Sequence, residues 1–188
     1  MAEQGTTDFN TEMIKAAREG DLNIVLQMLD LGATDFDKAM RMAAIGANEN
    51  IIKLMLEQGA TNFNETMANA AFKGHENIVR WMLDLGATDF DSAMEGAAGG
   101  GHENIVKLMI EKGATNFNNA MYWAAEEGYE SIVKLMLEKG ATGLHNATIY
   151  AEEKGHKNIV NLIAAWRNLA NAELGGAQQG VKCSVACV

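Results

Sequence analysis

Three histidines recur in one short pattern and raise the question of a metal site. His75, His102 and His156 each follow a glycine and precede a charged residue and the tripeptide Asn-Ile-Val. Zinc binds imidazole nitrogens at about 2 Å, whereas neighbouring helices pack about 8–10 Å apart. The three histidines belong to different copies of the repeat described below, so they cannot share one ion. We expect them to stabilise turns, and we predict no metal site.

A glycine-rich stretch, GAAGGGH at residues 96–102, raises the question of phosphate binding. A phosphate-binding loop follows a strand and ends in Gly-Lys-Ser/Thr. No strand is predicted before residue 96, and that ending is missing. No Ser/His/Asp or Cys/His set can be assembled either, and no pair of carboxylates stands out as an acid–base couple. We therefore expect a protein that is not an enzyme and that uses no cofactor.

Composition and charge narrow the classes of partner. The chain has 188 residues and a formal net charge of −10, which argues against nucleic acid or an anionic membrane surface. It shows no secretory signal and no apolar run of the ~20 residues that a membrane span needs. Both cysteines, Cys183 and Cys187, lie in the last six residues, so the body has no disulfide framework. These features indicate a cytoplasmic protein.

The chain is built from an internal repeat. The tripeptide Gly-Ala-Thr begins at residues 32, 59, 86, 113 and 140, always 27 residues apart. This register divides the chain into six units: 7–33, 34–60, 61–87, 88–114, 115–141 and 142–168. Residues 1–6 form an N-terminal extension, and residues 169–188 form a helix end followed by a mobile tail.

The sequence pattern of each unit predicts two helices joined by a glycine turn. Methionine and alanine recur three and four residues apart in the first helix, and an Ile-Val and Leu-Met stripe marks the second. A glycine separates the helices in five units, whereas Ala47 holds that position in the second unit. If the backbone there is left-handed, the alanine costs about 1 kcal/mol. Such pairs bury their stripes only when stacked, which predicts an all-α solenoid of six helix-turn-helix repeats.

The outer face of the second helix carries oppositely charged pairs four residues apart. The pairs are Glu49/Lys53, Glu76/Arg80, Glu103/Lys107 and Glu130/Lys134. Such surface pairs solvate the helix and need no function.

The repeat resembles the ankyrin repeat. GHENIVKLMIEKGA (101–114) is similar to the second half of that repeat, whose pattern is GHxEIVxLLLxxGA. SAMEGAA (92–98) is similar to the TPLHxAA of its first helix, with Met94 at the leucine position. The resemblance covers residues 7–168. It implies a solenoid whose first helices line a concave face that binds a protein partner.

The repeat is shorter than the usual ankyrin repeat, with 27 residues in place of about 33. Both helices match without gaps, so the missing residues are those that form the β-hairpin finger in ankyrin proteins. The chain resembles the fingerless variants of large DNA viruses and some intracellular parasites. That resemblance implies a host-interaction factor in the host cytosol, and finger-mediated binding is not carried over.

Both ends of the solenoid are expected to be closed to further repeats. Gln27 stands where later units have leucine or tryptophan, and Glu152 replaces a core alanine in the sixth unit. Terminal repeats need such water-tolerant faces. The tail lacks the cysteine fourth from the end that a prenylation box requires, because Val185 is there. Palmitoylation of Cys183 or Cys187 stays open, beside the simpler interpretation of two ordinary tail cysteines.

Three columns of the first helix vary among the units while their neighbours recur. They read Ile14, Arg41, Ala68, Glu95, Tyr122, Ile149; then Lys15, Met42, Asn69, Gly96, Trp123, Tyr150; then Arg18, Ile45, Phe72, Gly99, Glu126, Glu153. The resemblance puts these columns on the binding face, and aromatic residues and arginine anchor interfaces. The predicted partner-binding residues are Arg41, Met42, Ile45, Asn69, Phe72, Gly96, Gly99, Tyr122, Trp123, Glu126 and Tyr150. The alternative is that some of them pack between neighbouring repeats.

Gly96 and Gly99 allow two interpretations. A glycine within a helix costs up to about 1 kcal/mol relative to alanine, so these two residues represent drift or serve a purpose. The functional interpretation is an open notch between Phe72 and the Tyr122–Trp123 pair that receives a bulky group of the partner. On that interpretation, changing both glycines to alanine stabilises the solenoid and weakens binding.

Two functions follow from these observations. The first is a monomeric, non-enzymatic scaffold that binds a protein partner through the first helices. The alternative is a structural repeat protein that assembles into an oligomer or filament, against which the closed ends argue. An enzyme seated in the groove has no motif in its favour.

Overall fold

The described residues form helices joined by short turns. A computed structural model of the chain describes the backbone of residues 8–182 and the side chains of residues 8–170 and 172. The helices are α1 (Phe9–Glu19), α2 (Leu22–Asp30), α3 (Phe36–Ile45), α4 (Glu49–Glu57), α5 (Phe63–Lys73), α6 (Glu76–Asp84), α7 (Phe90–Gly100), α8 (Glu103–Lys112), α9 (Phe117–Glu127), α10 (Glu130–Glu138), α11 (Leu144–Lys154) and α12 (Lys157–Lys182). Over residues 8–182 no strand occurs, and the predicted all-α fold is confirmed. The expected N-terminal extension, Cys183 and Cys187 lie outside the described residues.

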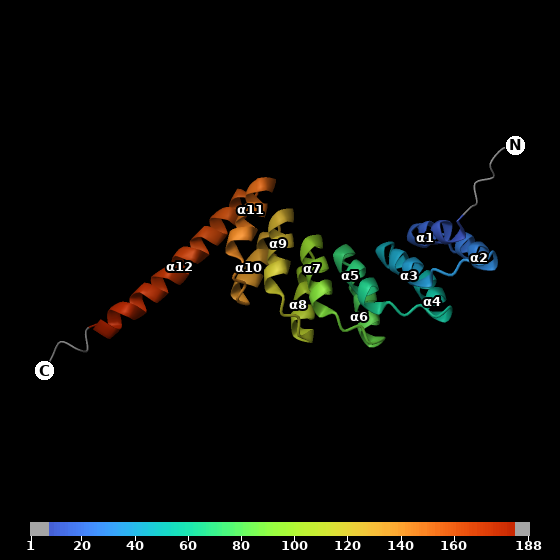
Figure 1. The fold of residues 1–188 in the computed structure, drawn as a ribbon, viewed down its shortest axis with the longest axis horizontal. Coiled ribbons are helices and arrows are strands. Elements are labelled where there is room, and N and C mark those ends of the chain that lie inside the picture. Colours follow the sequence, from blue (N-terminus) through green and yellow to red (C-terminus); the bar gives the residue numbers. More distant parts are fainter. Residues whose placement is uncertain (1–7, 183–188) are drawn as a thin grey trace. The chain divides into compact units, whose positions relative to one another are not determined.

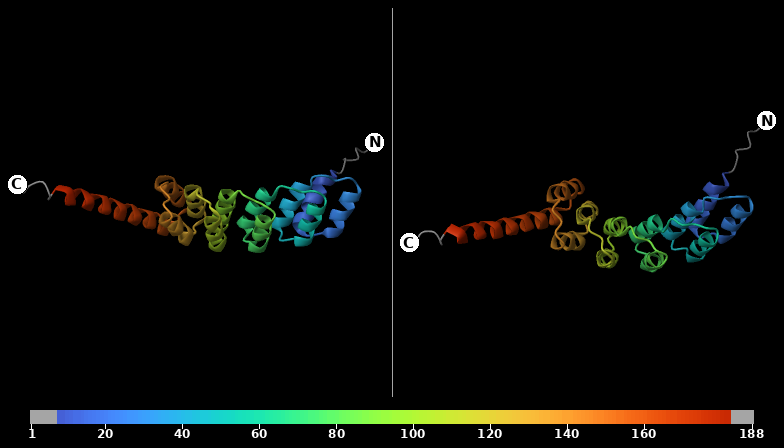
Figure 2. Two further views of the ribbon diagram at one scale, coloured as in Figure 1. Left: turned by 90° about the horizontal axis from the view of Figure 1, so that it is seen from below. Right: turned by 60° about the horizontal axis from the view of Figure 1, so that its bottom comes forward.

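The helices fall into two compact units, residues 1–116 with α1–α8 and residues 117–188 with α9–α12. In the first unit α1, α3, α5 and α7 lie side by side in one row, and each packs on the helix that follows it (Figure 1, Figure 2). In the second unit α9 packs on α10 and α11, while α12 contacts α10 and α11. Each unit is therefore a stack of helix pairs, as the repeat predicts.

The core of each unit consists of the recurring methionines and alanines together with the apolar stripe of the second helix. Met40 and Ala43–Ala44 in α3 are fully buried, and so are Ile52 and Met55 in α4. Alanine has no side chain beyond Cβ, so adjacent first helices approach closely, and the flexible methionine fills the remaining gaps. The columns that recur in the sequence are thus the columns that the packing requires.

Glycine turns join the two helices of a repeat in the predicted way. Gly20, Gly74, Gly101, Gly128 and Gly155 have φ between 78° and 89°. Ala47 adopts φ 57° at the same position of the second repeat. A Cβ disfavours this left-handed backbone by about 1 kcal/mol, so the predicted exception is confirmed.

Short polar side chains cap several of the first helices. Asp8 accepts from the backbone N–H of Asn10, Asn62 from that of Glu65, and Asp89 from that of Ser92. The hydroxyl of Thr11 also donates to Asp8 and lowers the pKa of this carboxyl below its ordinary value.

A ladder of side-chain hydrogen bonds links each repeat to the next. The second residue of a first helix accepts from two consecutive backbone N–H groups of the following loop, 24 and 25 residues further along the chain. The ladder residues and their donors are Asn10 with Thr34 and Asp35, Asp37 with Thr61 and Asn62, Asn64 with Thr88 and Asp89, Asp91 with Thr115 and Asn116, and Asn118 with Thr142 and Gly143. The oxygen–nitrogen distances run from 2.6 to 3.1 Å. The loop that replaces the missing finger is therefore held by the preceding repeat.

The ladder residue is an aspartate only where the loop residue that it binds is uncharged, and it is an asparagine where that loop residue is an aspartate. The acidic Asp37 and Asp91 bind the neutral Asn62 and Asn116. Where the loop residue is an aspartate, the ladder residue is the neutral Asn10 or Asn64, and Asn118 binds Gly143. In these five ladder contacts an aspartate thus never binds a loop residue that is itself acidic, which avoids like-charge repulsion in a chain whose net charge is already −10.

The two ends of the repeat array differ in how well they are closed. Glu152 is exposed, and α12 continues to Lys182, so this helix ends further along the chain than the 27-residue register indicates. At the other end Gln27 is exposed as predicted, but Leu26 and Leu31 of the same repeat are 44% and 49% exposed. The first repeat is therefore more apolar on its surface than a closed end requires.

The ladder predicts the stability of two variants at one position. Asp37→Ala removes the acceptor from two backbone N–H groups, and we expect it to lower the free energy of unfolding by about 1–3 kcal/mol. Asp37→Asn keeps the acceptor oxygen, as in three of the other ladder positions, and should lower it by less than half of that amount. Urea unfolding followed by circular dichroism measures both. Equal losses in the two variants would contradict the ladder.

Candidate functional site

The recurring histidines bind backbone carbonyls of the preceding repeat. Nε2 of His75 lies 3.2 Å from the carbonyl oxygen of Ile45, and Nε2 of His156 lies 3.0 Å from that of Glu126. In the second repeat Asn48 holds the same position and donates to the carbonyl of Ala17 at 2.9 Å. Because these carbonyls end the first helices, the predicted turn-stabilising role is confirmed for His75 and His156. Within the described part of the chain, no group of three His, Cys, Asp or Glu side chains lies close enough to hold a metal ion.

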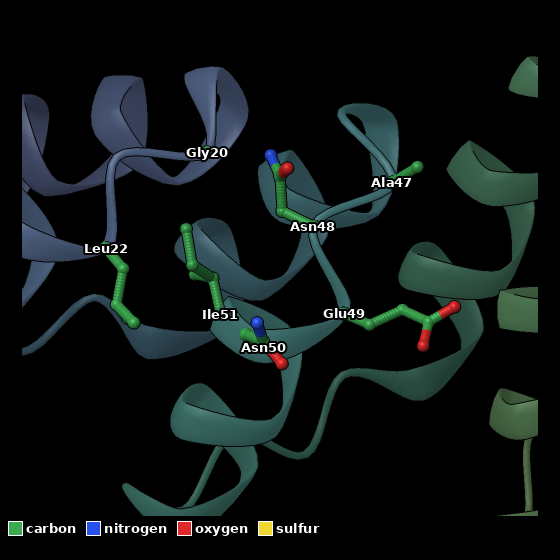
Figure 3. A pocket seen from close by; sticks show the side chains of 7 residues that line it. All are labelled: Gly20, Leu22, Ala47, Asn48, Glu49, Asn50 and Ile51. Atoms are coloured by element: carbon green, nitrogen blue, oxygen red, sulfur yellow. The ribbon is translucent and has the colours of Figure 1, made fainter.

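One pocket lies beside the turns, where a polar side chain binds backbone carbonyls. It has a volume of about 350 Å³ and lies between the first and second repeats, with Leu22 and Ile51 in its lining. Figure 3 shows Asn48 pointing toward Gly20 and the Glu49 carboxylate pointing away from Leu22. The Asn48 amide is already bound to the carbonyls of Ala17 and Arg18. The pocket therefore carries no group that is arranged for chemistry.

Two of the predicted binding residues in the first unit are engaged within the protein. The Arg41 guanidinium forms an ion pair with Glu65 of the next repeat. Asn69 donates to the backbone carbonyl of Glu65 at 2.8 Å, within its own helix. The Arg41–Glu65 pair connects neighbouring repeats. It agrees with the alternative interpretation, in which some residues of the variable columns pack between repeats.

Other predicted residues of the first unit are accessible. Met42 lines a groove of about 580 Å³ between α1 and α3, together with Ile14, Lys15 and Arg18. Ile45, one turn beyond Met42, is half-buried.

Phe72 is the predicted aromatic residue in α5, and it is exposed. Its side chain is 46% exposed, and the Lys73 ammonium lies 5.0 Å from the centre of its ring. This is a cation–π distance. Phe72 thus presents an apolar face on the row of first helices.

The structure corrects the interpretation of Gly96 and Gly99 as an open notch. Gly99 is buried. A Cβ added to Gly96 would lie 2.7 Å from the carbonyl oxygen of Ala68, and one added to Gly100 would clash with the carbonyl oxygen of Phe72. Gly96 and Gly100 lie one turn apart, so both face α5 and let the two backbones approach each other. The space that looked empty in the sequence is filled by the neighbouring helix.

In the second unit the variable columns bring aromatic rings together. The ring centres of Tyr122 and Tyr150 are 6.2 Å apart, and the rings are tilted by 45°. Trp123 is 48% exposed and Tyr150 is 40% exposed. Glu126 lies one turn beyond Trp123 and pairs with Lys154 of the next repeat at 3.2 Å. Three of the predicted aromatic residues are thus on one pair of helices, α9 and α11.

Two features of the surface were not anticipated from the sequence. The ladder residues escaped notice because asparagine and aspartate at a helix start also suit local caps. Leu22 and Leu26 stand where the second to fifth repeats carry the charged pairs, such as Glu76 and Arg80. In that pair a guanidinium nitrogen of Arg80 lies 2.7 Å from a carboxylate oxygen of Glu76. Comparison of the six repeats could have revealed this replacement.

These observations define a class of protein, namely a helical repeat protein whose buried columns recur from repeat to repeat and whose first helices carry a variable face. The family model described as ankyrin repeats (3 copies) matches residues 13–94 and again residues 94–175. The chain belongs to the ankyrin repeat family.

Comparison with solved structures agrees with this assignment. The chain is similar to the structure titled "Crystal structure of human ASB11 ankyrin repeat domain", with a TM-score of 0.61 and 20% sequence identity over 82% of each chain. At this identity the likeness concerns the fold alone. No curated protein matches the chain. Among the described residues no helix is long and apolar enough to cross a membrane.

The close approach of α5 and α7 predicts the sign of a stability change. Alanine in place of glycine normally stabilises a helix by up to about 1 kcal/mol. Gly96→Ala should instead lower the free energy of unfolding by about 1–3 kcal/mol, because the new methyl group overlaps the Ala68 carbonyl. Chemical unfolding of the purified protein measures the difference. A variant more stable than the natural protein would restore the notch interpretation.

Proposed function

We propose that this protein is a non-enzymatic scaffold that binds a protein partner through the exposed face of its first helices. Ankyrin repeats generally mediate protein–protein interaction, and the chain belongs to that family. We also propose that the protein is a monomer. We place it in the cytoplasm because the repeats contain no cysteine that could form a disulfide. The partner-binding residues that we propose are the accessible members of the variable columns.

The exposure of Phe72 and Trp123 carries this proposal. Both are about half exposed, although the repeat pattern does not require an aromatic residue in either column. The corresponding positions of other repeats include Arg18 and Glu126 in one column and Lys15 in the other. Burial of an exposed tryptophan or phenylalanine at an interface lowers the free energy, because apolar surface leaves water. Tryptophan is also enriched among interface hot spots.

Trp123 and Phe72 are the residues to change. We expect Trp123→Ala and Phe72→Ala each to weaken binding of a captured partner by about 30-fold or more, because hot-spot truncations cost about 2 kcal/mol or more. Neither change should lower the melting temperature by more than a few degrees, since both side chains are half exposed. Affinity capture from a native lysate, followed by titration of the captured protein, makes the measurement.

Leu85→Ala is the matched control. Leu85 is 38% exposed and apolar, but it lies at the end of a second helix, outside the variable columns. It should retain capture. Loss of capture in all three variants, or unfolding of the two aromatic variants, would contradict a specific surface on the first helices.

A second candidate function, self-assembly through the first repeat, has its own observation. Leu22 and Leu26 are four residues apart and are 37% and 44% exposed, so they form an apolar stripe on one face of α2. The second to fifth repeats place charged residues there, for example Glu103 and Lys107. Exposed apolar stripes of this kind favour association of two copies.

The self-assembly candidate predicts the effect of restoring the charged pair. The wild type would form species heavier than the 20.3 kDa monomer as its concentration rises, and the double variant Leu22→Glu with Leu26→Lys would stay at the monomer mass. Light scattering coupled to size-exclusion chromatography measures the mass. A wild type that stays monomeric at all concentrations removes this candidate.

A further inference from the structure

A glycine at the start of α11 leaves room for one ring of the aromatic face of α9 and α11. Gly143 precedes α11 at the position where the preceding repeats have Asp35, Asn62, Asp89 and Asn116. A Cβ at Gly143 would lie 2.7 Å from Cζ of Tyr122 and would clash with the tyrosine hydroxyl. The one repeat junction that carries a tyrosine in this column therefore also carries the glycine that makes room for it. Tyr122 is packed against the start of α11, and it supports the ring of Tyr150 at 6.2 Å.

Each of the two exposed rings has a carboxylate one turn further along its own helix. Trp123 is followed three residues later by Glu126, and Tyr150 is followed three residues later by Glu153. Residues three apart share a helix face, so each exposed ring has a carboxylate one turn beyond it. Over α9 and α11 together the acidic residues are Glu126, Glu127, Glu152 and Glu153, whereas Lys154 is the one lysine or arginine. All four acids lie in the last turns, where the helix dipole adds further negative potential.

The protein itself places a cation on this face. The Lys154 ammonium lies 3.2 Å from Glu126 and joins α11 to α9. Glu126 is 25% exposed and Lys154 is 50% exposed, so water and an incoming group can reach the pair. An arginine or lysine of a partner could bind in the same way, with its charge shared between the carboxylates and the faces of Trp123 and Tyr150.

We propose that the α9–α11 face, defined by Tyr122, Trp123, Tyr150, Glu126 and Glu153, binds a segment of a protein partner that carries arginine or lysine beside apolar residues. The inference rests on the proposed binding function and names the chemistry of the partner at this face. The apolar rings take the hydrocarbon part of the segment, and the carboxylates select its charge. The net charge of −10 attracts a basic segment and disfavours a second copy of the chain as the occupant.

A library of random 12-residue peptides displayed on phage tests this chemistry. The library is selected on the immobilised full-length protein and, in parallel, on its Trp123→Ala variant. We expect peptides that bind only the protein with Trp123 to be enriched in arginine and lysine. Trp123-dependent peptides without basic residues would overturn the inference while leaving the proposed function intact. Absence of any Trp123-dependent peptide would also overturn it, and capture of the native partner, with its loss in Phe72→Ala, would then decide the proposed function separately.

Charge variants measured with the best synthetic peptide refine the test. The double variant Glu126→Gln with Glu153→Gln should weaken binding about tenfold, because two charge-assisted contacts are lost. Lys154→Gln should strengthen binding about threefold, because the internal competitor for Glu126 is removed. Glu138→Gln, on the exposed side of α10, is the matched control and should change nothing. A Lys154→Gln variant that binds more weakly, or equal effects of the double variant and Glu138→Gln, would overturn the inference, provided that circular dichroism shows each variant folded.

Discussion

The hydrogen-bond ladder between consecutive repeats is the interaction on which the rest of the structure depends. In each junction one asparagine or aspartate oxygen accepts from two backbone N–H groups of the next loop, as Asp37 does from Thr61 and Asn62. Longer ankyrin repeats would fill this region with a finger, whereas here a loop of a few residues must be held by its neighbour. The ladder satisfies backbone donors that would otherwise lack partners and fixes where each first helix begins.

At some positions a glycine lets a helix pack closely against a particular neighbour. Gly96 and Gly100 let α7 approach the backbone of α5, and Gly143 makes room for Tyr122. In each case the missing Cβ is explained by an atom of the adjacent repeat. The repeat therefore varies in two ways, since some substitutions adjust the spacing between helices and others change the exposed face.

The difference between the recurring buried columns and the variable exposed columns agrees with the binding function that we propose. Histidines, asparagines and many carboxylates are used in turns, caps and junctions, as His156 is with the carbonyl of Glu126. Accessible side chains of the first helices include aromatic ones, of which Trp123 and Phe72 are the most exposed. Side chains that packed helix pairs hold within each unit lose little entropy on binding, which suits recognition of another protein.

The period of 27 residues, the glycine turns, the strained Ala47 and the buried methionine and alanine columns could all be predicted from the sequence. Each depends on local geometry or on a pattern that six copies repeat. The roles of Gly96, Gly100 and Gly143 could not be, because a missing Cβ looks the same whether solvent or a carbonyl oxygen occupies its place. The pairing of Arg41 with Glu65 and of Glu126 with Lys154 was equally hidden. These contacts join residues 24 or more positions apart, and their existence depends on how closely and at what angle two helices pack, which the local pattern does not encode.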